Sequence, residues 1–127
     1  MARLLWISLG GAAGTAARYL LSGWIARTAG PGFPWGTLAV NAIGSFLLGL
    51  LMQVPLGSAS LSPTLRLALT TGVLGGFTTY STFNYETLRA MEEGAWPVAF
   101  ANLGATVLGC LLAGWLGFAV GRWMVAS

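Results

Sequence analysis

The stretch TTGVLGGFTTYSTFN, residues 70–84, decides how this chain folds. It lies inside a long apolar segment, yet it combines three glycines with a polar run: Gly72, Gly75, Gly76, then Thr78, Thr79, Ser81, Thr82 and Asn84. Each glycine weakens a helix by about 1 kcal/mol relative to alanine. Polar groups in apolar surroundings must also find hydrogen-bond partners. The stretch therefore predicts a helix that is broken in mid-segment, where its backbone lines a cavity or binds an ion.

The composition outside this stretch is that of a membrane protein. Of the 127 residues, 56% are hydrophobic and only 7% are charged. Soluble domains average about 25% charged residues. The six basic residues are all Arg and the three acidic residues are all Glu. So few charges cannot cover a water-facing surface, and we expect an integral membrane protein.

The same composition excludes several classes of function. The chain has no His or Asp and one cysteine, Cys110. Zinc sites, Ser-His-Asp triads, carboxylate dyads and an internal disulfide therefore cannot be assembled, and we do not expect an enzyme. No G-x-x-x-x-G-K-[ST] motif is present, so we expect no nucleotide site. A net charge of +3 spread around a membrane bundle also makes no basic patch for nucleic acid.

Four stretches are long and apolar enough to cross a bilayer, which takes about 20 residues per helix. They are residues 4–25, 36–54, 64–91 and 97–121. All five prolines fall between these stretches or at their edges, and Trp24, Trp35, Trp96 and Trp123 mark their ends. We therefore expect an all-α membrane protein, a single domain over residues 1–127 with four transmembrane helices, the third of them broken.

The arginines do not set an orientation for such a bundle. With four spans both termini share one side, together with Arg3, Arg66 and Arg122. The opposite side takes Arg27, Arg89 and Arg18, which lies nearer the first loop. Orientation normally follows the excess of Lys and Arg, and three against three leaves none. The balance favours insertion in both directions and hence an antiparallel homodimer, although small proteins can also reach balanced counts by chance.

The break itself suggests two kinds of ligand. Freed carbonyls near Gly75 and Thr78 would suit a hard cation, and hydroxyls on the following helix would suit an anion. Tyr80 and Phe83 are three residues apart and could turn their positive ring edges to that anion, although core packing is the more common reason for two aromatic residues at that spacing. The alternative for the whole stretch is a kink whose Ser and Thr side chains bond back to the helix.

Two further polar stripes run along the neighbouring spans. Residues at helical spacing in the second span are Thr37, Asn41, Gly44 and Ser45, and those in the fourth are Asn102, Thr106, Cys110 and Gly114. Close helix packing explains the small residues, including the pairs Gly10/Gly14 and Gly117/Gly121. It explains Asn41 poorly, because an amide in mid-span must be hydrogen-bonded or functional.

Three segments together resemble the CrcB/Fluc family of small bacterial fluoride channels. They are GGAAGTAARY at 10–19, WGTLAVNAIGSFLLG at 35–49 and GVLGGFTTYSTFNYE at 72–86. With the fourth span, the resemblance covers essentially the whole chain. It implies a dual-topology homodimer in the bacterial cytoplasmic membrane, in agreement with the arginine count.

The resemblance also implies roles for individual residues. Asn41 would present its amide to the pore, with Thr37 on the same wall. The ring edges of Tyr80 and Phe83 would coordinate fluoride, and Ser81 and Thr82 would supply a hydroxyl track beside them. Backbone carbonyls of Gly75 and Thr78 would hold a structural sodium ion on the dimer axis. Glu86 would lie near a pore end, Arg18 would neutralise a vestibule or pair within the bundle, and Thr106 would line the pore.

The chain departs from the family pattern at two places. Tyr80 replaces the commoner Phe and adds a hydroxyl that needs a partner. On the fourth span, Asn102, Thr106 and Cys110 stand where some members carry Tyr and small hydroxyl residues; of these three, Thr106 fits the pattern best.

The expected function is therefore passive, fluoride-selective export down the electrochemical gradient, which relieves fluoride toxicity. Two other classes remain open. A non-transporting assembly subunit would use the glycines but would have little need of Asn41. A small proton-coupled multidrug-type exporter needs a carboxylate within the membrane, usually in the first span, which here contains no acid.

Overall fold

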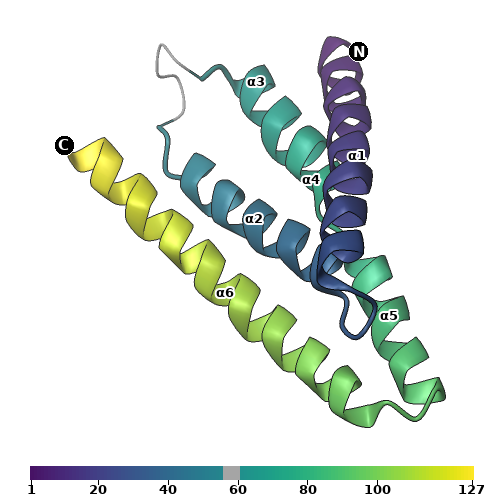
Figure 1. Ribbon diagram of the computed structural model, residues 1–127. Helices are drawn as coiled ribbons and strands as arrows, with labels where there is room; N and C mark the ends of the chain where they lie inside the picture. Colours follow the sequence, from purple (N-terminus) through teal and green to yellow (C-terminus); the bar gives the residue numbers. More distant parts are fainter. Residues whose placement is uncertain (56–60) are drawn as a thin grey trace.

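The computed structural model of the chain describes residues 1–55 and 61–127, and every regular element in these ranges is helical. In chain order the elements are α1 (Ala2–Ala29), α2 (Trp35–Leu51), α3 (Pro63–Leu67), the π-helical segment η1 (Ala68–Leu74), α4 (Gly75–Phe77), α5 (Tyr80–Glu92) and α6 (Trp96–Ala126) (Figure 1). The all-helical class is confirmed. α3, η1 and α4 follow one another directly and form one continuous rod.

The helices coincide closely with the four apolar stretches of the sequence. Three of the stretches each form one helix, α1, α2 or α6, and the stretch 64–91 forms two rods separated after Phe77. By length and composition alone, α6, with its 31 residues, is the one helix among the described residues that could cross a membrane. α2 is comparably apolar but has only 17 residues.

Local sequence signals explain where several helices begin and end. α1 ends at Gly30, whose φ of 89° lies in the left-handed region that glycine adopts freely. Ser62 caps α3, accepting a hydrogen bond from the Leu65 N–H, and Pro63 is the first residue of that helix. Arg66 then donates to the Leu51 and Val54 carbonyls at the end of α2, where a cation also suits the helix dipole. These hydrogen bonds join the start of the α3–η1–α4 rod to the end of α2.

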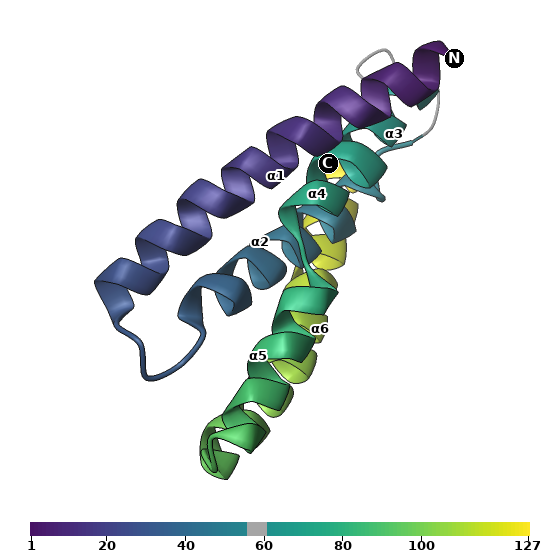
Figure 2. The same ribbon diagram turned by 90° about the vertical axis from the view of Figure 1, so that its right-hand side faces the viewer.

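Glycines allow two pairs of helices to approach closely. α1 lies along η1 and α4, and α2 lies along α6 (Figures 1 and 2). A Cβ added at Gly14 would overlap the Val73 carbonyl, and one at Gly117 would overlap the Phe46 carbonyl. Close packing is therefore confirmed for these two glycines, as expected for small residues between membrane helices. α5 packs against the first part of α6, which completes the walls of the site described below.

The arginines divide between the two ends of the molecule, with one exception. Both chain termini, the end of α2 and the start of α3 lie toward one end, and the α1–α2 and α5–α6 connections lie toward the other (Figure 1). Arg18 lies nearer the first loop than the N-terminus, as expected, but it is not at a helix end. Arg18 lies well inside α1, and its side chain is held by the Gly76 carbonyl. The arginines near the helix ends therefore stand three against two.

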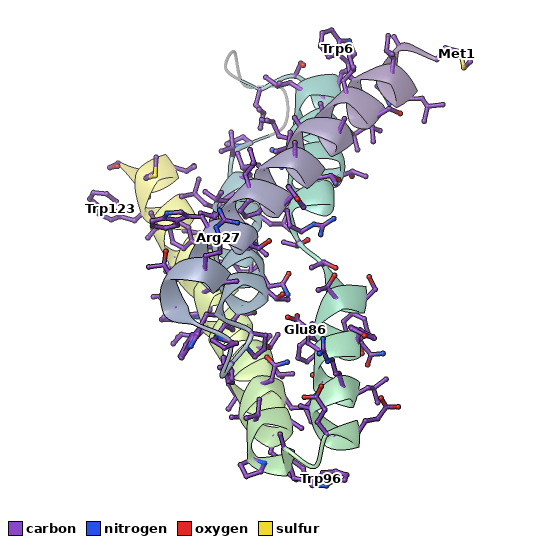
Figure 3. The ribbon with its side chains drawn as sticks, turned by 45° about the vertical axis from the view of Figure 1, so that its right-hand side comes forward. Met1, Trp6, Arg27, Glu86, Trp96 and Trp123 are labelled. Atoms are coloured by element: carbon purple, nitrogen blue, oxygen red, sulfur yellow. The ribbon has the colours of Figure 1, made fainter. Side chains whose placement is uncertain are left out.

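Tryptophans lie exposed near the helix ends, where an aromatic belt would be expected. The exposed fraction is 58% for Trp24, 47% for Trp35, 50% for Trp96 and 72% for Trp123. Figure 3 shows Trp96 and Trp123 projecting from the two ends of α6. These side chains are amphipathic and suit the boundary between hydrocarbon and water.

Candidate functional site

The break predicted within residues 70–84 lies at Thr78 and Thr79. Both residues are extended, with φ and ψ of −88° and 159° at Thr78 and −151° and 121° at Thr79. The three glycines themselves keep helical backbone, Gly72 in η1 and the other two in α4. The interruption therefore follows the glycine cluster and falls on the polar residues after it.

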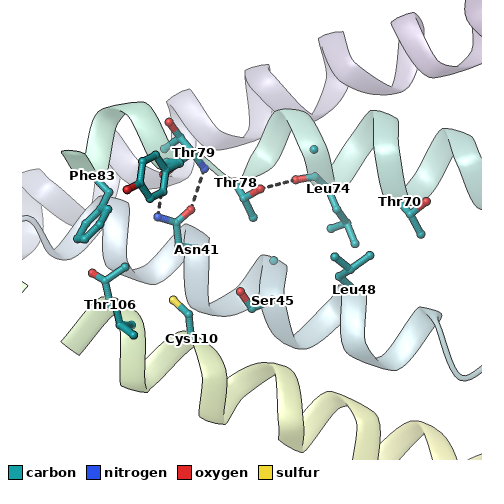
Figure 4. Close-up of a pocket in the computed structure, with 14 residues that line it drawn as sticks. Asn41, Ser45, Leu48, Thr70, Leu74, Thr78, Thr79, Phe83, Thr106 and Cys110 are labelled. Carbon is teal, nitrogen blue, oxygen red and sulfur yellow. Dashed lines mark hydrogen bonds between the residues drawn. The ribbon is translucent and has the colours of Figure 1, made fainter. Parts of the chain in front are cut away.

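Asn41 on α2 completes the hydrogen bonding of this break. Its Nδ2 donates to the Thr79 carbonyl at 3.0 Å, and its Oδ1 accepts from the Thr79 N–H at 2.8 Å (Figure 4). The Asn41 side chain is only 9% exposed. The amide thus satisfies both backbone groups of a residue that belongs to no helix, which is what buried polar backbone requires. This pairing explains why an amide stands in the middle of an apolar helix.

The break also leaves carbonyls without their helical partners, among them the carbonyl of Gly75. In an unbroken helix the Thr79 N–H would donate to the Gly75 carbonyl, but here it donates to Asn41. Thr78 keeps its N–H on the Leu74 carbonyl and adds its hydroxyl there at 3.0 Å. Back-bonding of the expected kind is therefore present at Thr78, alongside the break rather than in place of it.

Side chains on both sides of the break hold its two helical ends. Thr79 is the N-cap of α5, because its Oγ1 accepts from the Thr82 N–H at 3.3 Å. The Thr79 hydroxyl lies 3.1 Å from that of Thr82. Arg18 Nε donates to the Gly76 carbonyl at 3.0 Å. Glycine is needed at position 44, since an added Cβ would overlap the Thr78 methyl group.

A groove of about 350 Å³ opens beside the break, between α2, the η1–α4 rod, α5 and α6 (Figure 4). Of the site residues predicted from sequence, it brings together Asn41, Gly75, Thr78, Tyr80, Phe83 and Thr106. The polar stripe of α2 adds Gly44 and Ser45, and the ladder of α6 adds Cys110. The groove thus combines an amide, hydroxyls, a thiol and two aromatic rings within mostly apolar walls.

The two aromatic residues of the groove differ in burial. Tyr80 is 77% exposed, whereas Phe83 is 5% exposed. Their ring centroids are 5.8 Å apart with an interplanar angle of 66°, an edge-to-face arrangement. In this geometry the positive edge of one ring meets the negative face of the other. The exposed phenol therefore stands at the open side of the groove.

The other site residues predicted from the sequence do not line the groove. Ser81 is exposed on α5, and the Thr82 hydroxyl is engaged with Thr79. Thr37 is 8% exposed and lies against Glu86. The Glu86 Oε1 atom is buried and has no hydrogen-bond partner within residues 1–55 and 61–127. These two residues form a second polar spot, at the α1–α2 and α5–α6 end of the molecule.

Sequence reasoning missed a polar residue behind the groove, Thr87, and four residues of the groove lining: Leu48, Thr70, Leu74 and Val107. Thr87 lies one helical turn after Phe83, so its position on the same face could have been inferred. Its partner Asn102 could not, because the pairing depends on how α5 and α6 are aligned. Asn102 does not line the groove but lies behind Thr106, to which it is hydrogen-bonded.

Comparisons with known proteins agree on one family. The family model described as CrcB-like protein, Camphor Resistance (CrcB), matches residues 5–118. A protein of Sorangium cellulosum (strain So ce56) named fluoride-specific ion channel FluC is 56% identical over 127 residues, 100% of both chains. Proteins with the same name from Anaeromyxobacter dehalogenans (strain 2CP-1) and Geobacter sp. (strain M21) are 56% and 50% identical over 124 and 122 residues. These alignments cover 98% of each chain for the former, and 96% of this chain and 98% of the relative for the latter. The chain therefore belongs to the CrcB family.

Proposed function

We propose that this protein is a fluoride-selective passive ion channel that exports fluoride from the cytoplasm. The observation that carries the proposal is the likeness, over the full length of both chains, to a relative named fluoride-specific ion channel at 56% identity. The channel is not an enzyme: fluoride crosses unchanged. Under an inside-negative potential of about 100 mV, each exported charge gains about 2.3 kcal/mol. Fluoride that enters as neutral HF and dissociates inside can therefore leave passively.

The groove supports this proposal through its donors. Fluoride holds its water tightly, so a narrow pore must replace that water with hydrogen-bond donors. The Asn41 amide has a second N–H besides the one given to Thr79, and Thr106 carries a hydroxyl. The edges of Tyr80 and Phe83 add weakly positive surface. The groove lining among the described residues contains no Arg, so no fixed cation would trap the anion, as conduction requires.

The residues outside the groove extend the same path. We assign Thr37 and Glu86 to one pore end, where the carboxylate and hydroxyl lie together. Ser81 and Thr82 follow Tyr80 on α5 and would continue a hydroxyl track. The positive charge of Arg18 would make the electrostatic potential of a pore vestibule more positive, while its Nε donates to the Gly76 carbonyl.

The working unit would be an antiparallel homodimer with four spans per chain, embedded in the lipid of the bacterial inner membrane. Two features support a partner at the groove: the groove is open on one side, and Tyr80 is 77% exposed there. The near balance of arginines supports insertion in both orientations. A two-fold axis in the membrane plane would then relate the two chains.

A structural sodium ion fits the break. Gly75 and Thr78 both line the groove, and the Gly75 carbonyl has lost its helical N–H to the Asn41 pairing. Backbone carbonyls are oxygen ligands of the kind that hard cations prefer. No cluster of His, Cys, Asp or Glu competes for a metal in residues 1–55 and 61–127. The positive charge of a bound sodium ion would stabilise the extended backbone at Thr78 and Thr79.

The test is fluoride efflux from liposomes. The purified protein is reconstituted into vesicles loaded with potassium fluoride, valinomycin is added, and efflux is followed with a fluoride electrode. Vesicles loaded with potassium chloride serve as the matched control. We expect fast fluoride efflux with negligible chloride loss.

The other outcomes separate the remaining classes. No efflux from well-folded protein would overturn the channel proposal and favour a non-transporting subunit. Efflux that requires a proton gradient would instead favour a proton-coupled exporter.

A further inference from the structure

A buried hydrogen-bond network joins α5 to α6 directly behind the groove. Thr87 Oγ1 donates to the Phe83 carbonyl at 2.8 Å, and Asn102 Nδ2 donates to Thr87 Oγ1 at 2.9 Å. Thr106 Oγ1 donates to Asn102 Oδ1 at 3.2 Å. Thr87 is 4% exposed and Asn102 is 2% exposed, and neither lines the groove. Both ends of the network, Phe83 and Thr106, do line it.

The number of available protons fixes the direction of every bond in this network. A hydroxyl has one proton, and Thr87 gives its proton to the Phe83 carbonyl. Thr87 can therefore only accept from Asn102, which must present Nδ2 to it and Oδ1 to Thr106. The Thr106 proton consequently points at Asn102, although Thr106 itself lines the groove. Thr106 can donate to an anion only when that proton turns away from Asn102.

We propose that Thr87 and Asn102 are positioning residues for fluoride passage. Together they fix the position of Phe83 on α5 relative to Thr106 on α6, and Asn102 Oδ1 accepts the Thr106 proton while no anion is bound. The inference rests on the proposed channel function and deepens it. Asn102 suits the task because a neutral amide oxygen holds the proton without a charge that would repel fluoride. Each polar side-chain atom of Thr87, Asn102 and Thr106 has at least one partner within the network, which lets the network stay buried.

The first test compares fluoride efflux among variants of this network. Thr87→Val keeps the shape of the side chain and removes its hydroxyl. We expect efflux to fall on the order of tenfold, the scale of one lost hydrogen bond. Asn102→Leu should cause a similar fall. The double variant should be no slower than either single variant, because both substitutions disable one unit. Thr87→Ser, which restores the hydroxyl, should restore efflux.

A matched control is Thr28→Val. The Thr28 hydroxyl makes the same kind of back-bond, to the Trp24 carbonyl at 2.9 Å, but lies near the end of α1 and outside the groove. Efflux through this variant should equal that of the wild type. Wild-type efflux with an unimpaired Thr87→Val variant would overturn the inference. A wild-type protein without efflux would overturn the proposed function and this inference with it, so the two failures are distinguishable.

A second measurement, by NMR, does not depend on fluoride efflux through any variant. The chain has three asparagines, Asn41, Asn84 and Asn102. In protein labelled with ¹⁵N-asparagine, the Asn102 side-chain resonances are assigned by their loss in Asn102→Leu. We expect slow hydrogen–deuterium exchange of this amide, and a shift when potassium fluoride replaces potassium chloride. Asn102 side-chain chemical shifts that are the same in potassium fluoride and potassium chloride would overturn the role of Asn102 in placing the Thr106 proton.

Discussion

At the scale of single residues, the chemistry of the site depends on the two bonds between Asn41 and Thr79. Asn41→Asp removes the donor that faces the Thr79 carbonyl and sets two oxygens against each other. It also adds a fixed negative charge to the path of an anion. Fluoride efflux should therefore fall by more than about tenfold, because a broken buried hydrogen bond alone accounts for that much. Liposome efflux measures the change directly.

The control for this prediction is Gln53→Glu, the same exchange of amide for carboxylate at a residue outside the groove, just past the end of α2. Its efflux should stay within about twofold of the wild type, since Gln53 is partly exposed beyond the end of α2, where salt screens the added charge. Wild-type efflux through Asn41→Asp would remove Asn41 from the conduction path.

At the scale of elements, the contact of α1 with η1 is set by glycine. Gly14→Ala forces a methyl group into the Val73 backbone, which cannot retreat as a flexible side chain would. Overpacking of this kind costs about 1–3 kcal/mol. The unfolding temperature in detergent should therefore fall. Gly11→Ala is the matched control: its nearest atom, the Gly72 carbonyl oxygen, is 3.9 Å away. An equal loss of stability in both variants would contradict this account of the α1–η1 contact.

Which elements could be predicted from sequence follows from how local their causes are. The broken segment was predictable because glycines and polar residues are adjacent in the chain at 70–84. The need of Asn41 for a partner was also predictable, because an unpaired amide in an apolar helix is too costly. The partner itself, Thr79, was not. It depends on the alignment of α2 with the break, as the pairing of Thr87 with Asn102 depends on that of α5 with α6.

The π-helical geometry of η1 lay beyond sequence reasoning for a related reason. Residues 68–74 contain two threonines and a glycine, a composition that also fits an ordinary α-helix. Tight packing of Gly72 against the Ile7 carbonyl gives this segment a close tertiary neighbour. The wider turn thus occurs where contacts from α1, far away in sequence, act on the backbone. Such π-helical turns are often found at functional sites.

At the scale of the whole molecule, the near balance of arginines makes a prediction about assembly. Arg3, Arg66 and Arg122 lie toward one end and Arg27 and Arg89 toward the other. Arg27→Ala leaves three against one, so nearly all chains should insert with their termini in the cytoplasm. Chains that share one orientation cannot form an antiparallel pair. Fluoride export by cells that express only this variant should therefore be lost, although Arg27 does not line the groove.

The complementary variant makes this prediction specific. Arg3→Ala combined with Arg122→Ala leaves one arginine against two and should bias insertion the other way. Alone it should also fail to export fluoride, while co-expression with Arg27→Ala should restore export because each supplies the orientation that the other lacks. A reporter fused after Ser127 measures the orientation of each variant independently of transport. Normal export by Arg27→Ala in a single orientation would show that the working unit needs no antiparallel partner.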